Sequence, residues 1–218
     1  MTDEIKAVAR RHLAADGANL SLRAVARDIG MVSSALYRYF PSRDELLTAL
    51  ILDAYNAMGE VAEAADAAVT HRGDIVGRWL AVTHAVRAWT LAQPHEYALI
   101  YGTPVPGYAA PADTIAPATR PIAVLGSILV DAQKAGKLQP GAVPPMPRAL
   151  RTELKRAADA VAPGIDERAM ALAMMAWTEL YGAISFELFG RIDNVIDERT
   201  AWFDVQMRVL LTFVGVRR

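Results

Sequence analysis

The chain has 218 residues, 53% of them hydrophobic, and its 23 basic and 24 acidic residues give a net charge of −1. This apolar, nearly neutral composition excludes an intrinsically disordered chain and allows a sizeable buried core. The absence of cysteine excludes disulfides, thiolate metal sites and cysteine nucleophiles. The length suits one large domain, or a small domain joined to a larger one.

Neither a secretory signal nor a membrane span is predicted. The chain starts MTDEIKAVARR, which lacks the basic-then-apolar pattern of a signal peptide. The longest apolar stretch, 121–130, is interrupted by Gly126 and Ser127 and is about half as long as the ~20 residues needed to cross a bilayer. We therefore expect a cytoplasmic protein that does not contact a membrane.

The fold class expected from the sequence is all-α. Alanine-rich segments with 3.6-residue spacing recur, and no sustained two-residue alternation indicates strands. All prolines except Pro41 lie between Pro94 and Pro163, so both ends of the chain can form long helices. We predict loops at 102–119 and 137–147, and helices at 3–16, 21–29, 33–40, 43–68, 74–93, 94–101, 120–135, 148–162, 166–189 and 197–214.

The strongest functional pattern lies at 21–40, where two short helices are joined by a tight turn. Ala26 precedes Gly30 by four residues, a position where a small side chain lets two helices cross closely. Gly30 can adopt the left-handed conformation that such a turn requires. A small shared core is expected from Val25, Ile29, Val32 and Leu36. These features predict a helix-turn-helix.

The spacing of that core leaves the outer face of the 33–40 helix available to DNA. Small and polar side chains at a helix N-terminus approach base edges in the major groove, and tyrosine or arginine further along reaches phosphates. Tyr37 and Tyr39 are two residues apart and cannot share one buried face. The candidate DNA-contacting residues are Ser21, Arg23, Val32, Ser33, Ser34, Ala35, Tyr37, Arg38, Tyr39 and Arg43.

An ordinary three-helix bundle is the alternative for residues 1–48. This segment has seven basic and six acidic residues, a smaller excess than nucleic-acid-binding domains usually carry. The DNA-binding interpretation depends on how the charges are distributed. Arg23, Arg38 and Arg43 are expected on the DNA side, whereas several acidic residues stand at helix starts, where they stabilise the helix.

The run SLRAVARDIGMVSSALYRYFPSRDELL at 21–47 closely resembles the DNA-binding domain of the tetracycline-repressor (TetR) family of transcription regulators. The matching features are the Gly30 turn, the block LYRYF at 36–40, Pro41-Ser42, and a basic residue at Arg43 followed by ELL at 45–47. That family more often has lysine where Arg43 stands, and arginine keeps the charge. The resemblance implies a DNA-binding domain at 1–48 and a helical effector-binding and dimerisation domain at 49–218.

The last two predicted helices carry apolar and small-residue stripes. In 166–189, six apolar residues from Met170 to Leu188 follow spacings of three and four, which makes one seam. In TetR-like proteins the last two helices of each subunit form a four-helix dimer interface, so the resemblance implies a homodimer. Intrachain core is the alternative for some of these residues. The candidate dimer residues are Ala169, Ala173, Ala176, Ala183, Trp202, Val205, Val209 and Phe213.

The resemblance also implies a small-molecule pocket among the middle helices. Taken singly, an aromatic residue in such a helix is more often part of the core than of a ligand-binding wall, so core is the alternative for each candidate. The segment WTELYGAISFELFG resembles a subgroup whose C-terminal domain carries a Trp-x-x-x-His-Gly element, the WHG subgroup. Trp177 and Gly182 match that element, and Tyr181 replaces its histidine. The candidate ligand-binding residues are Trp79, His84, Trp89, Tyr97, Tyr101, Trp177 and Tyr181, with Glu179 as a further polar group.

Catalytic and metal-binding patterns are missing from the sequence. His95-Glu96 begins like the HExxH motif of zinc proteases, but Leu99 stands where the second histidine is required. The four histidines have no metal-ligand spacing, and no phosphate-binding or dinucleotide-binding glycine loop occurs. We therefore expect no enzyme activity, no metal and no cofactor.

These observations predict a homodimeric transcriptional repressor that binds a palindromic double-stranded DNA operator. A small apolar or amphipathic effector would shift the 43–68 helix, which connects the pocket to the helix-turn-helix, and release the operator. A helical small-molecule-binding protein without a role in transcription is the alternative. Operator binding distinguishes the two.

Overall fold

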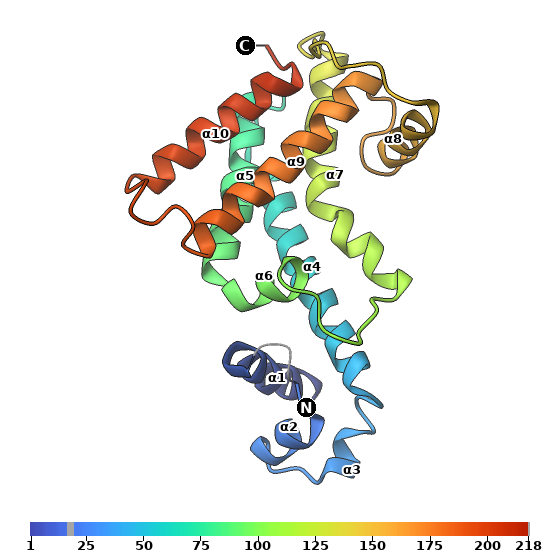
Figure 1. Ribbon diagram of the computed structural model, residues 1–218, viewed down its shortest axis with the longest axis vertical. Helices are drawn as coiled ribbons and strands as arrows, with labels where there is room; N and C mark the ends of the chain where they lie inside the picture. Colours follow the sequence, from blue (N-terminus) through green and yellow to red (C-terminus); the bar gives the residue numbers. More distant parts are fainter. Residues whose placement is uncertain (17–19, 218) are drawn as a thin grey trace. The chain divides into compact units, whose positions relative to one another are not determined.

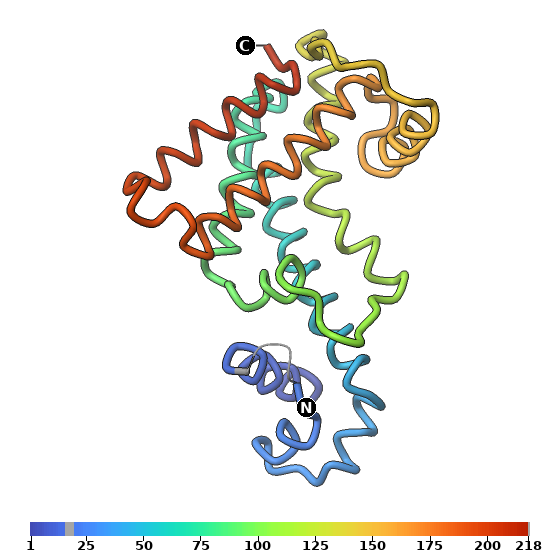
Figure 2. The backbone as a smooth tube through the Cα atoms, in the orientation of Figure 1, coloured from blue at the N-terminus to red at the C-terminus, as the bar shows by residue number. Residues whose placement is uncertain are grey.

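The computed structural model describes residues 1–16 and 20–217, and these residues are built from α-helices (Figures 1 and 2). Among them, the only β-type pairing is an isolated antiparallel bridge between Leu138 and Val216. The predicted all-α class is confirmed. The helices are α1 (Thr2–Asp16), α2 (Leu22–Asp28), α3 (Ser33–Leu36), α4 (Arg43–Ala68), α5 (Ile75–Ala92), α6 (Pro94–Tyr101), α7 (Ile115–Lys134), α8 (Arg148–Val161), α9 (Glu167–Leu188) and α10 (Arg199–Val214), with a 3-10 turn at Ala112–Thr114.

The helices form two compact units. Unit 1 consists of residues 1–57 and 92–118, and unit 2 consists of residues 58–91 and 119–218. Both α4 and α7 begin in unit 1 and continue into unit 2. The division into functional domains at residue 48 stays a prediction from the sequence.

Unit 1 is organised around an apolar core shared by α1, α2, α3 and the start of α4. Ser21 caps α2 by accepting a hydrogen bond from the backbone N–H of Ala24 at 3.4 Å, and Ser42 accepts one from the N–H of Glu45 at 3.1 Å. Gly30 ends the turn after α2 with a φ of +70°. The buried core residues are Ile5, Val8, Ala9, Leu20, Leu22, Val25, Ala26, Leu36, Phe40, Leu46, Leu47 and Leu50.

The third helix is shorter than the sequence predicts, because α3 ends at Leu36 and not at Phe40. Past its end, the N–H groups of Arg38 and Tyr39 donate to the carbonyls three residues back, at 3.2 and 2.9 Å. This is the tighter spacing of a 3-10 turn. Pro41 follows, and the residue before a proline is disfavoured in helical conformation.

The stretch 102–119, predicted as a loop because of its prolines, contains the start of α7 at Ile115. Pro117 lies in the first turn of α7, where the missing proline N–H costs no intrahelical hydrogen bond. Pro121 lies inside the helix and is buried. These two prolines therefore do not prevent the helix, which starts at Ile115 and not at the predicted position 120. The second predicted loop, 137–147, lies outside the helices.

Unit 2 places α9 between α8 and α10, in contact with both (Figure 1). Trp79 of α5 is buried, and its indole N–H donates to the carbonyl of Met207 on α10 at 3.0 Å. Arg87 of α5 forms a two-pronged ion pair with Glu187 of α9, at 2.7 and 2.5 Å. These contacts hold α5 against the two C-terminal helices.

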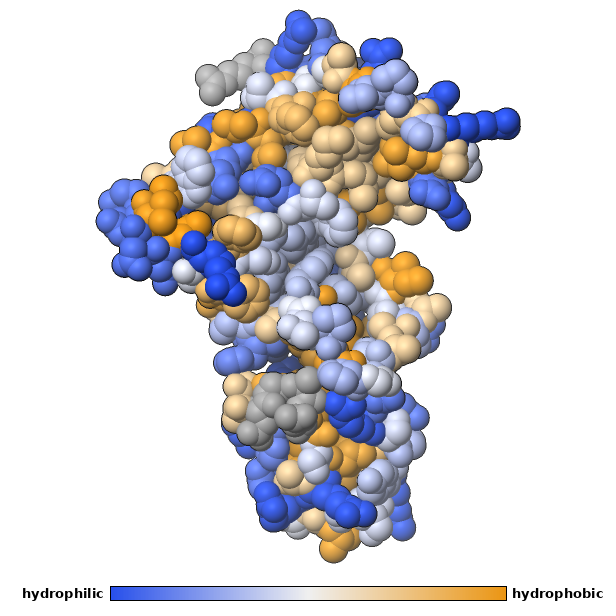
Figure 3. All heavy atoms as spheres, in the orientation of Figure 1, coloured by the Kyte–Doolittle hydropathy of each residue, from blue (hydrophilic) through white to orange (hydrophobic). Residues whose placement is uncertain are grey.

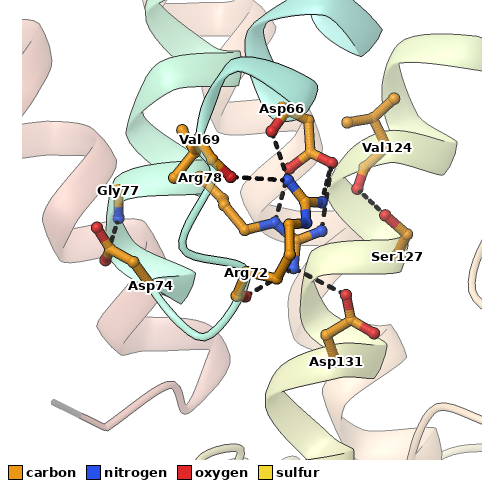
Figure 4. Close-up of polar contacts among 9 residues, drawn as sticks. All are labelled: Asp66, Val69, Arg72, Asp74, Gly77, Arg78, Val124, Ser127 and Asp131. Carbon is orange, nitrogen blue, oxygen red and sulfur yellow. Dashed lines mark hydrogen bonds and ion pairs between the residues drawn. The ribbon is translucent and has the colours of Figure 1, made fainter.

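A buried arginine ties α4, α5 and α7 together (Figure 4). Arg78 of α5 is 1% exposed. Its guanidinium donates to Asp66 near the end of α4 at 2.7 Å and to Asp131 of α7 at 2.8 Å. Arg72, in the turn between α4 and α5, also pairs with Asp66. The charge of Arg78 is thus compensated by two carboxylates from different helices, as burial requires.

Two helical stretches differ from the expectation that no segment of the sequence is long and apolar enough to span a membrane. By length and composition alone, α9 and the stretch Ala112–Lys134, which contains α7, are long and apolar enough to cross a bilayer. The expectation used only uninterrupted apolar runs and so missed them. Both helices contribute buried side chains to unit 2, among them Leu129 of α7 and Ile184 of α9, which is the ordinary pattern of core helices.

Candidate nucleic-acid interface and ligand pocket

Unit 1 holds α2 and α3 as a helix-turn-helix. α2 contacts both α1 and α3. Ala26 is fully buried at the crossing, and its carbonyl accepts a hydrogen bond from the N–H of Met31 at 2.8 Å, which closes the turn around Gly30. Leu36 is fully buried and anchors α3. The small residue and the left-handed glycine have the roles that the sequence predicts.

The segment that follows α3 presents side chains to solvent. Tyr37 and Tyr39 are 43% and 46% exposed. The side chains of Tyr37, Arg38 and Tyr39 make no hydrogen bond to the other described residues. Of the predicted DNA-contacting set, three residues are half-buried, namely Ser33, Ala35 and Arg43. The exposed ones are Ser21, Arg23, Val32, Ser34, Tyr37, Arg38 and Tyr39.

The predicted place of Val32 in the shared core is wrong, because its side chain is 69% exposed. Val32 is the N-cap residue of α3, with an extended backbone at φ −70° and ψ 140°, and so it lies outside the helix that buries Leu36. The same exposure keeps Val32 among the residues available to a partner. An apolar side chain there can contact the methyl group of a thymine.

Ion pairs fix the helices behind this surface. Arg10 of α1 lies 2.7 Å from a carboxylate oxygen of Asp53 on α4 and 3.0 Å from one of Glu96 on α6. The ring of His12 lies 2.7 Å from the carboxylate of Asp28 at the end of α2. This hydrogen bond lowers the pKa of Asp28. The helix-turn-helix therefore rests on helices joined by charged contacts as well as by the core.

Unit 2 contains a narrow pocket between α5, α7, the end of α8 and α9, called here the inner pocket. Its cavity volume is about 20 Å³. A β-carbon at Gly126 would lie 2.4 Å from the carbonyl oxygen of Val161, so glycine allows α7 and α8 to approach closely. The lining contains no charged side chain and consists of Trp79, Ile122, Leu125, Gly126, Leu129, Val161, Ala162, Ile165, Met170, Ala173, Met174 and Trp177.

Two of the seven predicted ligand-binding residues, Trp79 and Trp177, line the inner pocket. Tyr181 packs edge-on against Trp177, with ring centroids 6.0 Å apart, and its hydroxyl lies 3.5 Å from the sulfur of Met58. The buried phenol, in the position of the histidine of the WHG element, thus contacts α4. The assignment to that subgroup stays a prediction.

The other four predicted ligand residues lie elsewhere. His84 faces α10, where its ring lies 3.3 Å from Asp204, and Trp89 is half-buried on α5. Tyr97 and Tyr101 belong to unit 1, where their ring centroids are 5.2 Å apart. Sequence reasoning missed the lining from α7, because apolar residues at helical spacing are the signal of any buried helix.

The predicted dimer residues divide into exposed and buried groups. On α10, Trp202, Val205, Val209 and Phe213 are all exposed, Val209 by 59%. On α9, Ala169 and Ala176 are fully buried within the chain, so their prediction as dimer contacts is wrong. Ala173 lines the inner pocket, and Ala183 is half-buried. Small residues on α9 serve close packing inside unit 2.

A different face of α9 is exposed and apolar. Met175, in the middle of α9, is 51% exposed. Phe186, in its last turn, is 57% exposed, and Phe189, which directly follows the helix, is 49% exposed. Together with the four exposed residues of α10 they form what we call the C-terminal apolar face. Apolar side chains are visible over the α9 and α10 part of unit 2 in Figure 3. Which residues of α9 are exposed depends on which other helices cover the opposite side of α9.

Comparison with known proteins gives matches along most of the chain. Residues 5–50 match the family described as "Bacterial regulatory proteins, tetR family", and residues 79–210 match the "Tetracyclin repressor-like, C-terminal domain". HTH-type transcriptional regulators Rv1816 of Mycobacterium tuberculosis (strain ATCC 25618 / H37Rv) and Mb1846 of Mycobacterium bovis are each 38% identical to this chain. Each alignment covers 97% of this chain and 91% of the relative.

Solved structures have the same architecture. The crystal structure of SCO4313 is 34% identical in sequence, has a TM-score of 0.76, and covers 97% of this chain and 95% of its own. PfmR, a TetR family transcriptional regulator from Thermus thermophilus, is 17% identical with a TM-score of 0.62, over 98% of this chain and 99% of its own. At this low identity, the similarity to PfmR shows the fold alone.

A helix-turn-helix with exposed tyrosine and arginine side chains, joined through a continuous helix to a helical unit with a pocket, defines a DNA-binding transcriptional regulator. The relatives carry the same designation. The chain belongs to the TetR family.

Proposed function

We propose that the protein is a homodimeric repressor in the cytoplasm, released from a palindromic operator when a small apolar or amphipathic effector binds in unit 2. The observation that carries this proposal is the uncharged lining of the inner pocket. A pocket of this kind selects ligands by apolar contact. The helix α4, which contributes Met58 to unit 2, is the same helix whose start packs in the helix-turn-helix core.

The DNA contacts of this proposal come from the exposed segment around α3. Ser33, Ser34 and Ala35 are small enough for the helix to enter the major groove. Tyr37, Arg38, Tyr39 and Arg43 contact phosphates, and Ser21 and Arg23 contact the backbone beside the groove.

The C-terminal apolar face supports the dimer. Residues 202, 205, 209 and 213 are spaced by three or four positions and therefore lie on one side of α10. Several exposed apolar side chains on one side of a helix indicate an interaction site. A second copy supplies the matching surface, because a two-fold interface uses the same patch on both subunits. Two helix-turn-helix domains then reach half-sites about 34 Å apart.

Because the inner pocket is narrow, an effector has to move the walls of the pocket in order to bind. A ligand larger than a water molecule has to displace side chains from α5, α7, α8 or α9, because little space is free. Effector binding therefore favours a state with wider wall spacing, which differs in operator affinity. Such coupling typically amounts to ~1–3 kcal/mol.

Selection of bound sequences from random duplex DNA, at two salt concentrations, tests the DNA-binding part of the proposal. We expect enrichment of a palindrome whose half-sites lie on one face of the duplex. Binding that is salt-sensitive but independent of sequence would contradict an operator-specific regulator.

A reporter placed behind the selected operator tests repression. Expression of the protein should lower reporter output, and a copy of the operator with scrambled half-sites serves as the control. An increase in output would show activation and would overturn the repressor assignment.

A further inference from the structure

We propose that Tyr108, in the loop between α6 and α7, is a positioning residue for DNA binding. It acts through Thr48 and the first turn of α4, and so fixes the direction of Arg43. This inference rests on the proposed phosphate contact of Arg43. The candidate DNA-contacting residues end at position 43, so Tyr108 belongs to a part of the chain that the helix-turn-helix pattern does not include.

The loop at 102–111 belongs to unit 1, as the helix-turn-helix does. Its centre is a four-residue turn with the sequence Val-Pro-Gly-Tyr at 105–108. The N–H of Tyr108 donates to the carbonyl of Val105 at 3.1 Å, and Gly107 has a φ of +76°. Proline in the second position and a glycine of positive φ in the third are typical of a type II turn. Val105 and Tyr108, the two ends of the turn, both pack against the apolar core of the helix-turn-helix.

The hydroxyl of Tyr108 is the donor in a short chain of hydrogen bonds. The hydroxyl oxygens of Tyr108 and Thr48 are 2.9 Å apart, and the hydroxyl of Thr48 donates to the backbone carbonyl of Asp44 at 2.8 Å. A threonine hydroxyl has a single hydrogen. Because Thr48 gives that hydrogen to Asp44, Tyr108 has to donate to Thr48. Each bond in such a chain polarises and strengthens the next.

The chain of hydrogen bonds ends beside Arg43, the first residue of α4. The guanidinium of Arg43 lies 3.7 Å from the carboxylate of Asp44, and its side chain is 33% exposed. The other predicted basic contacts, Arg23 and Arg38, are exposed. A half-buried arginine has fewer directions available than an exposed one, so its direction depends on the backbone that carries it. Tyr108 restrains that backbone through Thr48 and Asp44.

A second contact keeps the end of α6 beside α4 independently of Tyr108. The hydroxyl of Tyr55 donates to the carbonyl of Ile100 at 3.5 Å, and its ring packs edge-on against Tyr101 with centroids 6.2 Å apart. Tyr55 and Thr48 are seven residues apart and therefore lie on the same face of α4. Tyr108→Phe also keeps the ring that packs on the core. This variant should therefore keep the fold and lose only the bond to Thr48.

Hydrogen exchange of the free protein tests the restraint without DNA. We expect Tyr108→Phe and Thr48→Val to increase exchange of the backbone N–H groups in the first two turns of α4 by roughly threefold to tenfold. Thr48→Ser, which keeps the hydroxyl, should exchange like the wild type. Unchanged exchange in Tyr108→Phe would overturn the proposal.

Thr152→Val is the matched control for Thr48→Val. The hydroxyl of Thr152 on α8 also donates to a carbonyl four residues back, at 3.1 Å. Loss of such a bond by itself has little effect on a helix, so exchange in α8 should rise by less than about twofold. Equal increases in the two helices would show that the bond to Tyr108 adds nothing.

A double-mutant cycle with Arg43 tests the role in DNA binding. Tyr108→Phe should lower the affinity for duplex DNA by roughly threefold to tenfold and make binding less dependent on salt, as loss of a phosphate contact does. In the Arg43→Gln background, Tyr108→Phe should have almost no further effect. If Tyr108 only stabilised the fold, it would lower affinity equally in both backgrounds. That result, or wild-type affinity in Tyr108→Phe, would overturn the proposal.

These outcomes are separable from the fate of the proposed function. Phosphate contacts carry no sequence information, so the cycle can be measured on any duplex that the protein binds, even when selection enriches no palindrome. If a palindrome is enriched but Arg43→Gln binds it as tightly as the wild type, the repressor proposal stands and the positioning role of Tyr108 fails.

Discussion

Gly59 of α4 faces Arg120 of α7 so closely that any side chain at position 59 would force Arg120 to move. A β-carbon there would lie 2.8 Å from the Cβ and 2.7 Å from the Nε of Arg120. Arg120 in turn donates to both carboxylate oxygens of Glu63, one helical turn along α4, at 2.8 Å each. Since α7 also lines the inner pocket through Ile122, this contact joins the pocket wall to α4.

Gly59→Ala is expected to destabilise the protein by roughly 1–3 kcal/mol, the range for overpacking, although the same change in an open helix stabilises by about 0.5–1 kcal/mol. The Cβ of Arg120 is part of the clash, so Arg120→Gly should relieve it. Urea unfolding of the two single variants and the double variant measures this. Additive effects would show that the two positions do not interact.

Arg78→Met is expected to lower the free energy of unfolding by roughly 1.5–3 kcal/mol, because it removes the hydrogen bonds from Arg78 to the carboxylates of Asp66 and Asp131, although Arg72 still pairs with Asp66. Chemical denaturation at neutral pH provides the measurement. Arg156→Met, on the exposed face of α8, is the control and should leave the midpoint nearly unchanged. Similar losses for both variants would argue against a special role for the cluster in Figure 4.

The same cluster predicts a loss of stability in acid. Burial raises the pKa of Asp66, but hydrogen bonds from Arg78 and Arg72 outweigh it and hold the pKa below its ordinary value. The unfolded chain therefore binds this proton more readily than the folded one. The contribution is present at neutral pH and is lost as the pH falls below about 4. Asp66→Asn should cost most at pH 7, and its deficit relative to wild type should shrink toward pH 3. A deficit independent of pH would refute this.

Phosphate contacts by Tyr37 and Arg38 predict weaker operator binding in their variants. Arg38→Gln should lower affinity across operators of different sequence and reduce the slope of log affinity against log salt by about one. Tyr37→Phe, which removes only the exposed hydroxyl, should weaken binding by a smaller factor. Fluorescence anisotropy with the selected operator measures both, and Arg156→Gln controls for net charge. Wild-type affinity in Tyr37→Phe and Arg38→Gln would remove both residues from the interface.

A charged residue in the C-terminal apolar face should separate the dimer. Val209→Glu places a carboxylate where the partner's apolar surface is expected, and burial of an unpaired charge is strongly unfavourable. Sedimentation velocity should show a dimer for the wild type and a monomer for this variant. Leu150→Glu, on an exposed apolar position of α8, should remain dimeric. A dimeric Val209→Glu would place the interface elsewhere.

The sequence by itself determined the features that depend on neighbouring residues. The helix-turn-helix needs Ala26, Gly30 and Leu36 at fixed offsets, and these positions hold those roles in the structure because a turn and two short helices are set by local spacing. The starts of α4 and α6 and the all-α class followed from the same local rules.

Only the tertiary structure decided which face of each helix is covered. The periodicity of α9 identified apolar and small stripes, but packing against α8 and α10 placed Ala169 and Ala176 inside and Met175 and Phe186 outside. The inner pocket combines residues from four helices, and these residues are up to about a hundred positions apart in the sequence. The spacing of residues within one helix does not show which residues of other helices lie beside it. Burial is a property of the assembled fold, whereas a helix start or a tight turn is a property of a few consecutive residues.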